Sequence, residues 1–123
     1  MTKFLKYWLP ALVWAGLLFY FSSIPHLSAP DLGFDFQDKV EHFIVYGILG
    51  YLIARLIVGS GNGNLQNGHL FWGALIGIVY GISDELHQSF VPGRYAGVDD
   101  VIADALGVIM AQMIFGWQYK NKK

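Results

Sequence analysis

The stretch GISDELHQSFVPGRYAGVDDVIAD, from Gly81 to Asp104, separates two long apolar runs. It carries five of the nine acidic residues in the chain, together with His87, Gln88 and Arg94. The flanking runs, from about residue 69 to 87 and from about 98 to 117, are each close to the 20 or so apolar residues that cross a bilayer. Polar groups packed densely between two such runs are costly unless they pair with one another or serve a function.

Two further apolar runs, about residues 7–24 and 40–58, precede these. The chain of 123 residues is 54% hydrophobic and only 14% charged, whereas a soluble domain is usually about 25% charged. A soluble helical bundle is the alternative, but it needs amphipathic helices, and these runs are apolar nearly all round in their middles. We therefore predict an all-α fold, a four-helix transmembrane bundle that forms one domain over residues 1–123.

Several functions and features are disfavoured by the composition. The chain has no cysteine, which excludes thiol catalysis, disulfides and thiolate metal sites, and its net charge of -1 argues against a nucleic-acid partner. No ionisable group lies in the middle of a predicted span, which argues against an ion channel or a proton-coupled transporter. The first run could be a cleaved signal peptide, but no A-x-A-like site follows it and Leu27-Ser28-Ala29 is followed by Pro30, so we expect a retained helix.

The charges separate by predicted helix end. Lys3, Lys6, Arg55 and the lysines after residue 119 lie at one set of ends, which the positive-inside rule makes cytoplasmic together with both termini. The loop SGNGNLQNGH at that side is a Gly/Asn-rich turn. The acidic residues all lie at the other, extracytoplasmic set of ends, where only Lys39 and Arg94 are basic: Asp31, Asp35, Asp38, Glu41, Asp84, Glu85, Asp99, Asp100 and Asp104.

A first motif opens the second predicted helix. Asp38, His42 and Tyr46 are spaced four residues apart and therefore share one helix face. Asp38 lies where an N-cap belongs, and capping would explain it fully. Capping does not explain His42, which lies one turn into an apolar helix and is either a satisfied structural residue or a functional group.

A second motif ends the third predicted helix. Asp84 and Glu85 lie at the helix C-terminus, which is the unfavourable end for negative charge, so we expect a raised proton affinity or a cationic partner. Gln88 lies one turn further on, and Pro92-Gly93 predicts a tight turn that folds Arg94 back over the helix ends. A purely structural Glu–Arg pair is the alternative. The candidate partners of the two acids are Arg94, His42, Lys39 or a metal ion.

A third motif opens the fourth predicted helix. Asp99 or Asp100 is interpreted as its N-cap, whereas Asp104 lies a turn inside an apolar helix on the same face as Asp100. Small residues, among them Gly107, continue this face, and a glycine stripe on the third run matches it, which indicates close helix packing. Ser22 and Ser23 end the first run at the same level, where bonding to backbone carbonyls is a sufficient role and a nucleophilic serine is a minor alternative.

These pieces together resemble the VanZ-like membrane proteins. The resemblance rests on Ser22-Ser23-x-Pro25, on DKxxHFxxY from Asp38 to Tyr46, on DExxQxFxPGR from Asp84 to Arg94, and on DxxAD from Asp100 onward. It covers most of the chain and implies a small bacterial multi-pass protein of the cell membrane, related to proteins associated with resistance to teicoplanin-type glycopeptides. One position departs from the pattern, because this chain has Asp104 where the family often has Asn.

Two hypotheses follow. The first is an enzyme, a hydrolase or transferase that acts at the outer leaflet on a lipid-linked or other cell-envelope substrate. In it His42 is a general acid or base, Glu85 a second acid or base or a metal ligand, Arg94 an anion-binding group and Asp38 the fourth core residue. Such a site suits a divalent cation such as Mg²⁺, Mn²⁺ or Zn²⁺. The spacing matches no dedicated metal motif, so the sequence does not identify a cofactor. The supporting residues are Asp84, Gln88, Asp100, Asp104 and Tyr46.

The second hypothesis is a non-catalytic envelope protein that binds a glycopeptide, a lipid headgroup or a membrane partner through the same polar groups. Charge-conserving substitution discriminates between the two. A binding protein should tolerate Glu85→Asp or Arg94→Lys in part, whereas a catalyst held to a strict geometry should not. The sequence fixes neither the substrate, the reaction nor the oligomeric state.

Overall fold

The computed structural model describes residues 2–25, 31–34, 36–60 and 68–122, and every regular element within them is helical. A π-helical turn, η1 (Phe4–Trp8), runs directly into α1 (Leu9–Ser22). The other helices are α2 (Gln37–Gly59), α4 (His69–Gln88) and α5 (Val98–Asn121). The all-α prediction with four main helices is confirmed. The predicted roles of Asp35, of residues 27–30 and of loop residues 61–67 lie outside the described part of the chain.

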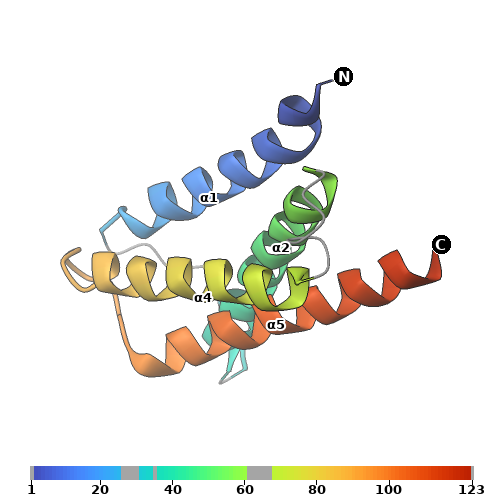
Figure 1. Cartoon of the computed structure of the whole chain (residues 1–123). Helices are drawn as coiled ribbons and strands as arrows, with labels where there is room; N and C mark the ends of the chain where they lie inside the picture. Colours follow the sequence, from blue (N-terminus) through green and yellow to red (C-terminus); the bar gives the residue numbers. More distant parts are fainter. Residues whose placement is uncertain (1, 26–30, 35, 61–67, 123) are drawn as a thin grey trace.

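The helices pack around α2. It has its largest interfaces with α5 and α4, while α1 lies against the bundle more loosely. The start of η1 and the end of α5 lie at the same end of the molecule, and the turn that joins α4 to α5 lies at the opposite end (Figure 1). The core between the helices is formed by Tyr46, Leu49, Ile53, Ile57 and Val108.

Glycines let these helices approach closely. A Cβ at Gly77 of α4 would lie 2.6 Å from the side chain of Val108 in α5, and one at Gly107 of α5 would collide with the backbone carbonyl of Phe43 in α2. Real Cβ atoms do not reach such distances, so only glycine permits this spacing. The interpretation of the glycine stripes as packing surfaces is therefore confirmed.

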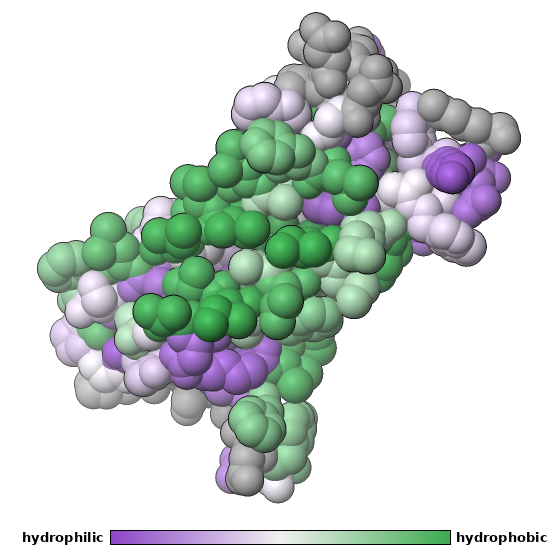
Figure 2. Space-filling model, turned by 60° about the horizontal axis from the view of Figure 1, so that its bottom comes forward, coloured by the Kyte–Doolittle hydropathy of each residue, from purple (hydrophilic) through white to green (hydrophobic). Residues whose placement is uncertain are grey.

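Many large hydrophobic side chains lie outward, and several polar side chains are buried. Leu12, Phe71, Val79, Ile109 and Met113 are among many large apolar residues that are exposed. Figure 2 shows a broad hydrophobic area on one face, with hydrophilic residues gathered in patches around it. Soluble monomers rarely expose apolar areas of this extent. The buried polar residues are Ser22, His69, Asp84, Glu85, Gln88, Asp100, Asp104 and Gln112.

Two helical segments are long and apolar enough to cross a membrane, Phe4–Ser22 and Gln37–Gly59. Helices α4 and α5 have a similar length, but each carries acidic residues in its last or first turns, where the polar groups of the bundle converge. The structure thus supports a small helical protein with candidate membrane helices.

The N-cap interpretations are wrong. The residue before α2 is Phe36 and the residue before α5 is Gly97, and neither helix has a side-chain cap. Asp38, Asp99 and Asp100 lie instead inside the first turns, where a negative charge still favours the helix dipole. Their carboxylates are turned toward Lys39, and this ion pairing takes the place of capping.

Candidate functional site

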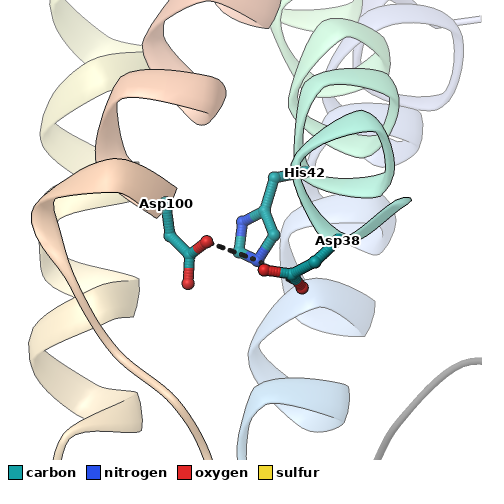
Figure 3. A group of neighbouring side chains, drawn as sticks. All are labelled: Asp38, His42 and Asp100. Atoms are coloured by element: carbon teal, nitrogen blue, oxygen red, sulfur yellow. Dashed lines mark ion pairs between the residues drawn. The ribbon is translucent and has the colours of Figure 1, made fainter. Parts of the chain in front are cut away.

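Four helix ends meet at the end of the bundle that holds the α4–α5 turn. The starts of α2 and α5 and the ends of α1 and α4 all contribute polar side chains there. Figure 3 shows Asp38 and His42 projecting from successive turns of α2 toward Asp100 at the start of α5. The helical spacing of four residues places the first two on one face, as the sequence predicted.

His42 is surrounded by carboxylates. Its Nδ1 lies 2.7 Å from Asp104 Oδ1 in a hydrogen bond and 3.9 Å from Glu85 Oε1. Its Nε2 lies 3.7 Å from Asp100 Oδ1 and 3.8 Å from Asp38 Oδ1. Asp104 is only 1% exposed, so the buried acid fixes the orientation of the ring while the side chain of His42 keeps 17% exposure. An imidazole oriented by a buried carboxylate is the arrangement that general acid–base catalysis uses.

Lys39 supplies the positive charge on the outer side of this cluster. Its Nζ lies 2.7 Å from both Asp38 Oδ2 and Asp100 Oδ1 and 3.0 Å from Asp99 Oδ2. The Tyr95 ring covers the ammonium group, with Nζ 5.3 Å from its centroid, and the Tyr95 hydroxyl donates to Asp99. That hydrogen bond raises the pKa of Tyr95, which keeps the phenol a donor.

The deeper carboxylates are incompletely paired. Asp84 Oδ2 accepts a hydrogen bond of 2.8 Å from the Tyr46 hydroxyl, and Glu85 Oε2 accepts one of 3.3 Å from the Gly97 backbone N–H. Within the described residues, Asp84 Oδ1, Glu85 Oε1 and Asp104 Oδ2 are buried without a hydrogen-bond partner. Such groups are rare and costly in folded proteins, and a proton, a water or an ion usually explains them.

Two sets of three residues have the spacing of metal ligands. We call His42, Glu85 and Asp104 the deep trio, and Asp38, His42 and Asp100 the rim trio. In each, one ligand atom per residue lies within 4.8 Å of the other two. Glu85 and Asp104 are both buried, whereas Asp38 at the rim is exposed.

A cavity of about 810 Å³ opens beside the cluster. His42, Asp38 and Asp100 line one part of it, and apolar side chains, including Leu18 and Phe21, line another. A volume of this size lies in the range of small-molecule sites. The cavity therefore combines a hydrophobic wall with the charged groups around His42.

Arg94 lies on the cavity and, as the predicted turn implied, against a helix end, but it contacts backbone carbonyls rather than one of the acids. The Pro92-Gly93 turn is confirmed, with φ of 75° at Gly93 and a hydrogen bond of 3.2 Å from Arg94 N–H to Val91 O. The guanidinium donates through Nη1 to the carbonyls of Phe21 and Ile24 at the end of α1. In the described part of the chain it forms no ion pair, so the alternative of a structural Glu85–Arg94 pair is not seen.

Gln88 and the serines of α1 connect α4 to α1. Gln88 Nε2 donates to Ser22 Oγ at 3.1 Å, and Ser23 Oγ donates to the Phe19 carbonyl, as expected for a serine at a helix end. Ser23 Oγ also lies 2.8 Å from His87 Nε2, and the His87 ring stacks on Phe19 with centroids 4.5 Å apart. These contacts give the two serines structural partners.

Of the predicted site residues, the structure brings Asp38, His42, Glu85, Asp100 and Asp104 into one cluster. Tyr46 and Asp84 form a hydrogen-bonded pair that lines the same cavity as His42, while Gln88 and Arg94 line it where they bond to α1. Sequence reasoning gave Lys39 only as one candidate partner. Its position three residues before His42 on the same helix face was the signal for its central place.

One comparison with known proteins agrees with these motifs. Neither the search of curated proteins nor the search of solved structures gave a significant match. A family model described as VanZ/LLP1 matches residues 7–118, which include all four main helices apart from the last few residues of α5. The chain therefore belongs to the VanZ/LLP1 family.

Proposed function

We propose that this is a multi-pass protein of the cell membrane that acts as a hydrolase or transferase on a lipid-linked or other cell-envelope substrate. All four main helices span the bilayer, both termini are cytoplasmic, and the His42 cavity opens at the extracytoplasmic face. The observation that carries the proposal is the His42–Asp104 hydrogen bond of 2.7 Å at the wall of a cavity large enough for a substrate.

The distribution of charge supports this orientation. Arg55 at the end of α2 donates a hydrogen bond of 3.1 Å to the backbone carbonyl of Lys6, which draws the basic ends of η1 and α2 together. Lys120 lies in the last turn of α5, and this end of α5 lies on the same side of the molecule as η1, opposite the α4–α5 turn (Figure 1). The positive-inside rule assigns such an end to the cytoplasm, and the acidic cluster then faces outward.

The lining of the cavity supports an amphiphilic substrate. Leu18, Phe21 and Val45 offer an apolar surface for a hydrocarbon chain. Arg94 lies on the same cavity, and among the described residues it donates through Nη1 alone. A guanidinium has further donors that bind phosphate or carboxylate in a planar fork. A lipid with an anionic headgroup fits both features.

In the proposed reaction His42 transfers a proton to or from the reacting group, and Asp104 orients its ring. General acid–base catalysis by a positioned side chain contributes about 100- to 10,000-fold to a rate. The family resemblance supplies a cellular readout, since the VanZ-like relatives are associated with resistance to teicoplanin-type glycopeptides.

The test compares wild type with His42→Gln in two assays. One measures the teicoplanin susceptibility of cells that express equal amounts of protein in the membrane. The other measures, by mass spectrometry, the conversion of lipid-linked envelope precursors by purified protein in nanodiscs. His69→Gln is the matched control, because His69 is a buried histidine at the opposite end of α4.

We expect His42→Gln to lose at least 100-fold in turnover and to abolish resistance, with His69→Gln close to wild type. Full turnover and full resistance by His42→Gln would contradict the proposal. Resistance without any product, together with tolerance of Glu85→Asp and Arg94→Lys, would instead establish a binding protein.

A further inference from the structure

The buried carboxylates near His42 differ in their pairing with cations in the described part of the chain. On the rim, the Lys39 ammonium group lies 2.7 Å from Asp38 and Asp100 and neutralises that side. In the deep trio no lysine or arginine of the described residues pairs with Glu85 or Asp104. His42 is shared between both trios, so the deep side has two buried carboxylates for at most one imidazolium charge.

The unpartnered atoms point to a bound group at the deep trio. Glu85 is 5% exposed and Asp104 is 1% exposed, yet Glu85 Oε1 and Asp104 Oδ2 have no hydrogen-bond partner within the described residues. Glu85 Oε1 faces the His42 ring, but its distance of 3.9 Å from Nδ1 is too long for a hydrogen bond. Asp84, the neighbour of Glu85, leaves Oδ1 unpartnered as well.

The distances suit a small cation better than a direct ion pair. Ligand atoms of a tetrahedral site with bonds of about 2.1 Å lie about 3.4 Å apart. The distances from His42 Nδ1 are 2.7 Å to Asp104 Oδ1 and 3.9 Å to Glu85 Oε1, which bracket this value. To reach this spacing, Asp104 Oδ1 would move away from Nδ1 by about 0.7 Å and Glu85 Oε1 toward it by about 0.5 Å.

We propose that His42, Glu85 and Asp104 bind a divalent transition-metal ion. An imidazole nitrogen with carboxylate oxygens favours Zn²⁺ or Mn²⁺, whereas Mg²⁺ prefers an all-oxygen shell and keeps several waters. Lys39 excludes the ion from the rim trio, because its ammonium group already occupies the space between Asp38 and Asp100. Of these three ligands His42 alone lines the cavity, and with an ion on its Nδ1 its Nε2, which faces Asp38 and Asp100, would be the atom left to exchange a proton with a substrate.

This proposal gives a reason for Asp104, which stands where the family often has Asn. Asp104 supplies a charged ligand where an Asn would supply a neutral one. We therefore expect Asp104→Asn to weaken metal binding, while the asparagine amide oxygen can still accept the hydrogen bond from His42 Nδ1 in metal-free protein. Mutation of a residue that hydrogen-bonds to a metal ligand typically lowers metal affinity 10- to 100-fold. Mutation of a ligand itself should lower it more.

The experiment loads purified protein in nanodiscs with Zn²⁺, Mn²⁺ or Mg²⁺ separately, removes free ion by desalting and measures bound metal by mass spectrometry. Titration calorimetry then gives the affinity. We expect one equivalent of Zn²⁺ or Mn²⁺ and little retained Mg²⁺. Glu85→Gln and Asp104→Asn should weaken binding more than 100-fold. Asp99→Asn is the matched control, because it removes an acid of the same cluster that belongs to neither trio, and it should change the affinity less than threefold.

A second measurement guards against variants that merely misfold. Pulsed electron paramagnetic resonance of bound Mn²⁺ should show a ¹⁴N coupling from an imidazole, and His42→Gln should lose it. The proposal fails if wild type retains no transition metal. It also fails if Asp38→Asn, a change at the rim, releases the ion as completely as Glu85→Gln does.

A catalytic role for the ion rests on the proposed function, whereas metal binding is measured independently of it. Wild-type protein that retains no transition metal but still converts substrate would overturn the metal inference and leave the enzyme proposal standing. Metal bound with the expected ligands, combined with full activity and resistance in His42→Gln, would overturn the enzyme proposal and leave the metal site standing.

Discussion

Replacing Lys39 with methionine should destabilise the protein, because this one ammonium group balances three carboxylates. Its Nζ lies 2.7 Å from Asp38 and Asp100 and 3.0 Å from Asp99. The three acids differ in their access to water. The Asp100 side chain is 2% exposed, whereas those of Asp38 and Asp99 are 57% and 50% exposed. Asp100 therefore carries most of the effect.

The size of the effect follows from this difference in burial. Removing one partner of a fully buried ion pair costs about 3–5 kcal/mol, because the other charge stays behind without compensation. Lys39 itself is 29% exposed, so water already screens part of the interaction. Pairs at the solvated rim add little. We expect Lys39→Met to lower the free energy of unfolding by about 2–3 kcal/mol.

The assay is reversible unfolding in mixed micelles with increasing denaturing detergent, followed by circular dichroism and tryptophan fluorescence. If the loss comes from an uncompensated Asp100, adding Asp100→Asn to Lys39→Met should restore about 1–2 kcal/mol, a coupling that a double-mutant cycle isolates. Lys120→Met, which removes an exposed lysine at the end of α5, should change stability by less than about 0.5 kcal/mol. Strictly additive costs, or a Lys39→Met variant as stable as Lys120→Met, would refute the reasoning.

Three further predictions concern residues that hold the helices together around the site. Gly107→Ala should destabilise the same unfolding transition by about 1–3 kcal/mol, since its Cβ meets the backbone of α2, whereas Gly16→Ala, with nothing within 4 Å, should be neutral or stabilising. Tyr46→Phe should cost about 1–3 kcal/mol by leaving both oxygens of the buried Asp84 carboxyl unpaired, and unchanged stability would show that another donor satisfies them. Arg94→Met should speed amide hydrogen exchange in the last turn of α1 by about 10-fold, because the carbonyls of Phe21 and Ile24 lose their donor, and exchange should stay unchanged at α5.

The fold was readable from the sequence because long apolar helices leave a simple signal. Apolar runs located all four main helices, and the positions of glycine indicated the surfaces that pack. The helix ends were less accurate, since α2 begins at Gln37 and α5 continues to Asn121. Hydropathy marks the apolar middle of a helix, while the backbone hydrogen bonds continue into polar residues that no apolar run includes.

The site was readable only in part. Spacing along α2 predicted that Asp38, His42 and Tyr46 share a face, because that face is a property of one helix. The partners of that face depend on how α2, α4 and α5 rotate against one another, which no local pattern records. The pairing of His42 with Asp104, and of Tyr46 with Asp84, is set by the glycine contacts that fix these rotations. Arg94 shows the same limit, because its turn was predictable and its carbonyl partners on α1 were not.

The same polar groups hold the helices together and form the candidate site, which decides how substitutions should be interpreted. In a bilayer the exposed apolar surface gives little drive for helices to associate, so close packing and polar contacts between helices carry the stability. Alanine at His42 or Asp104 would therefore weaken the bundle even if the site had no function. Isosteric changes separate the two roles: Asp104→Asn and Glu85→Gln keep the shape and can keep one hydrogen bond while removing a charge. If such variants remain as stable as wild type but lose metal binding or turnover, the charges at this end of the bundle serve function rather than folding.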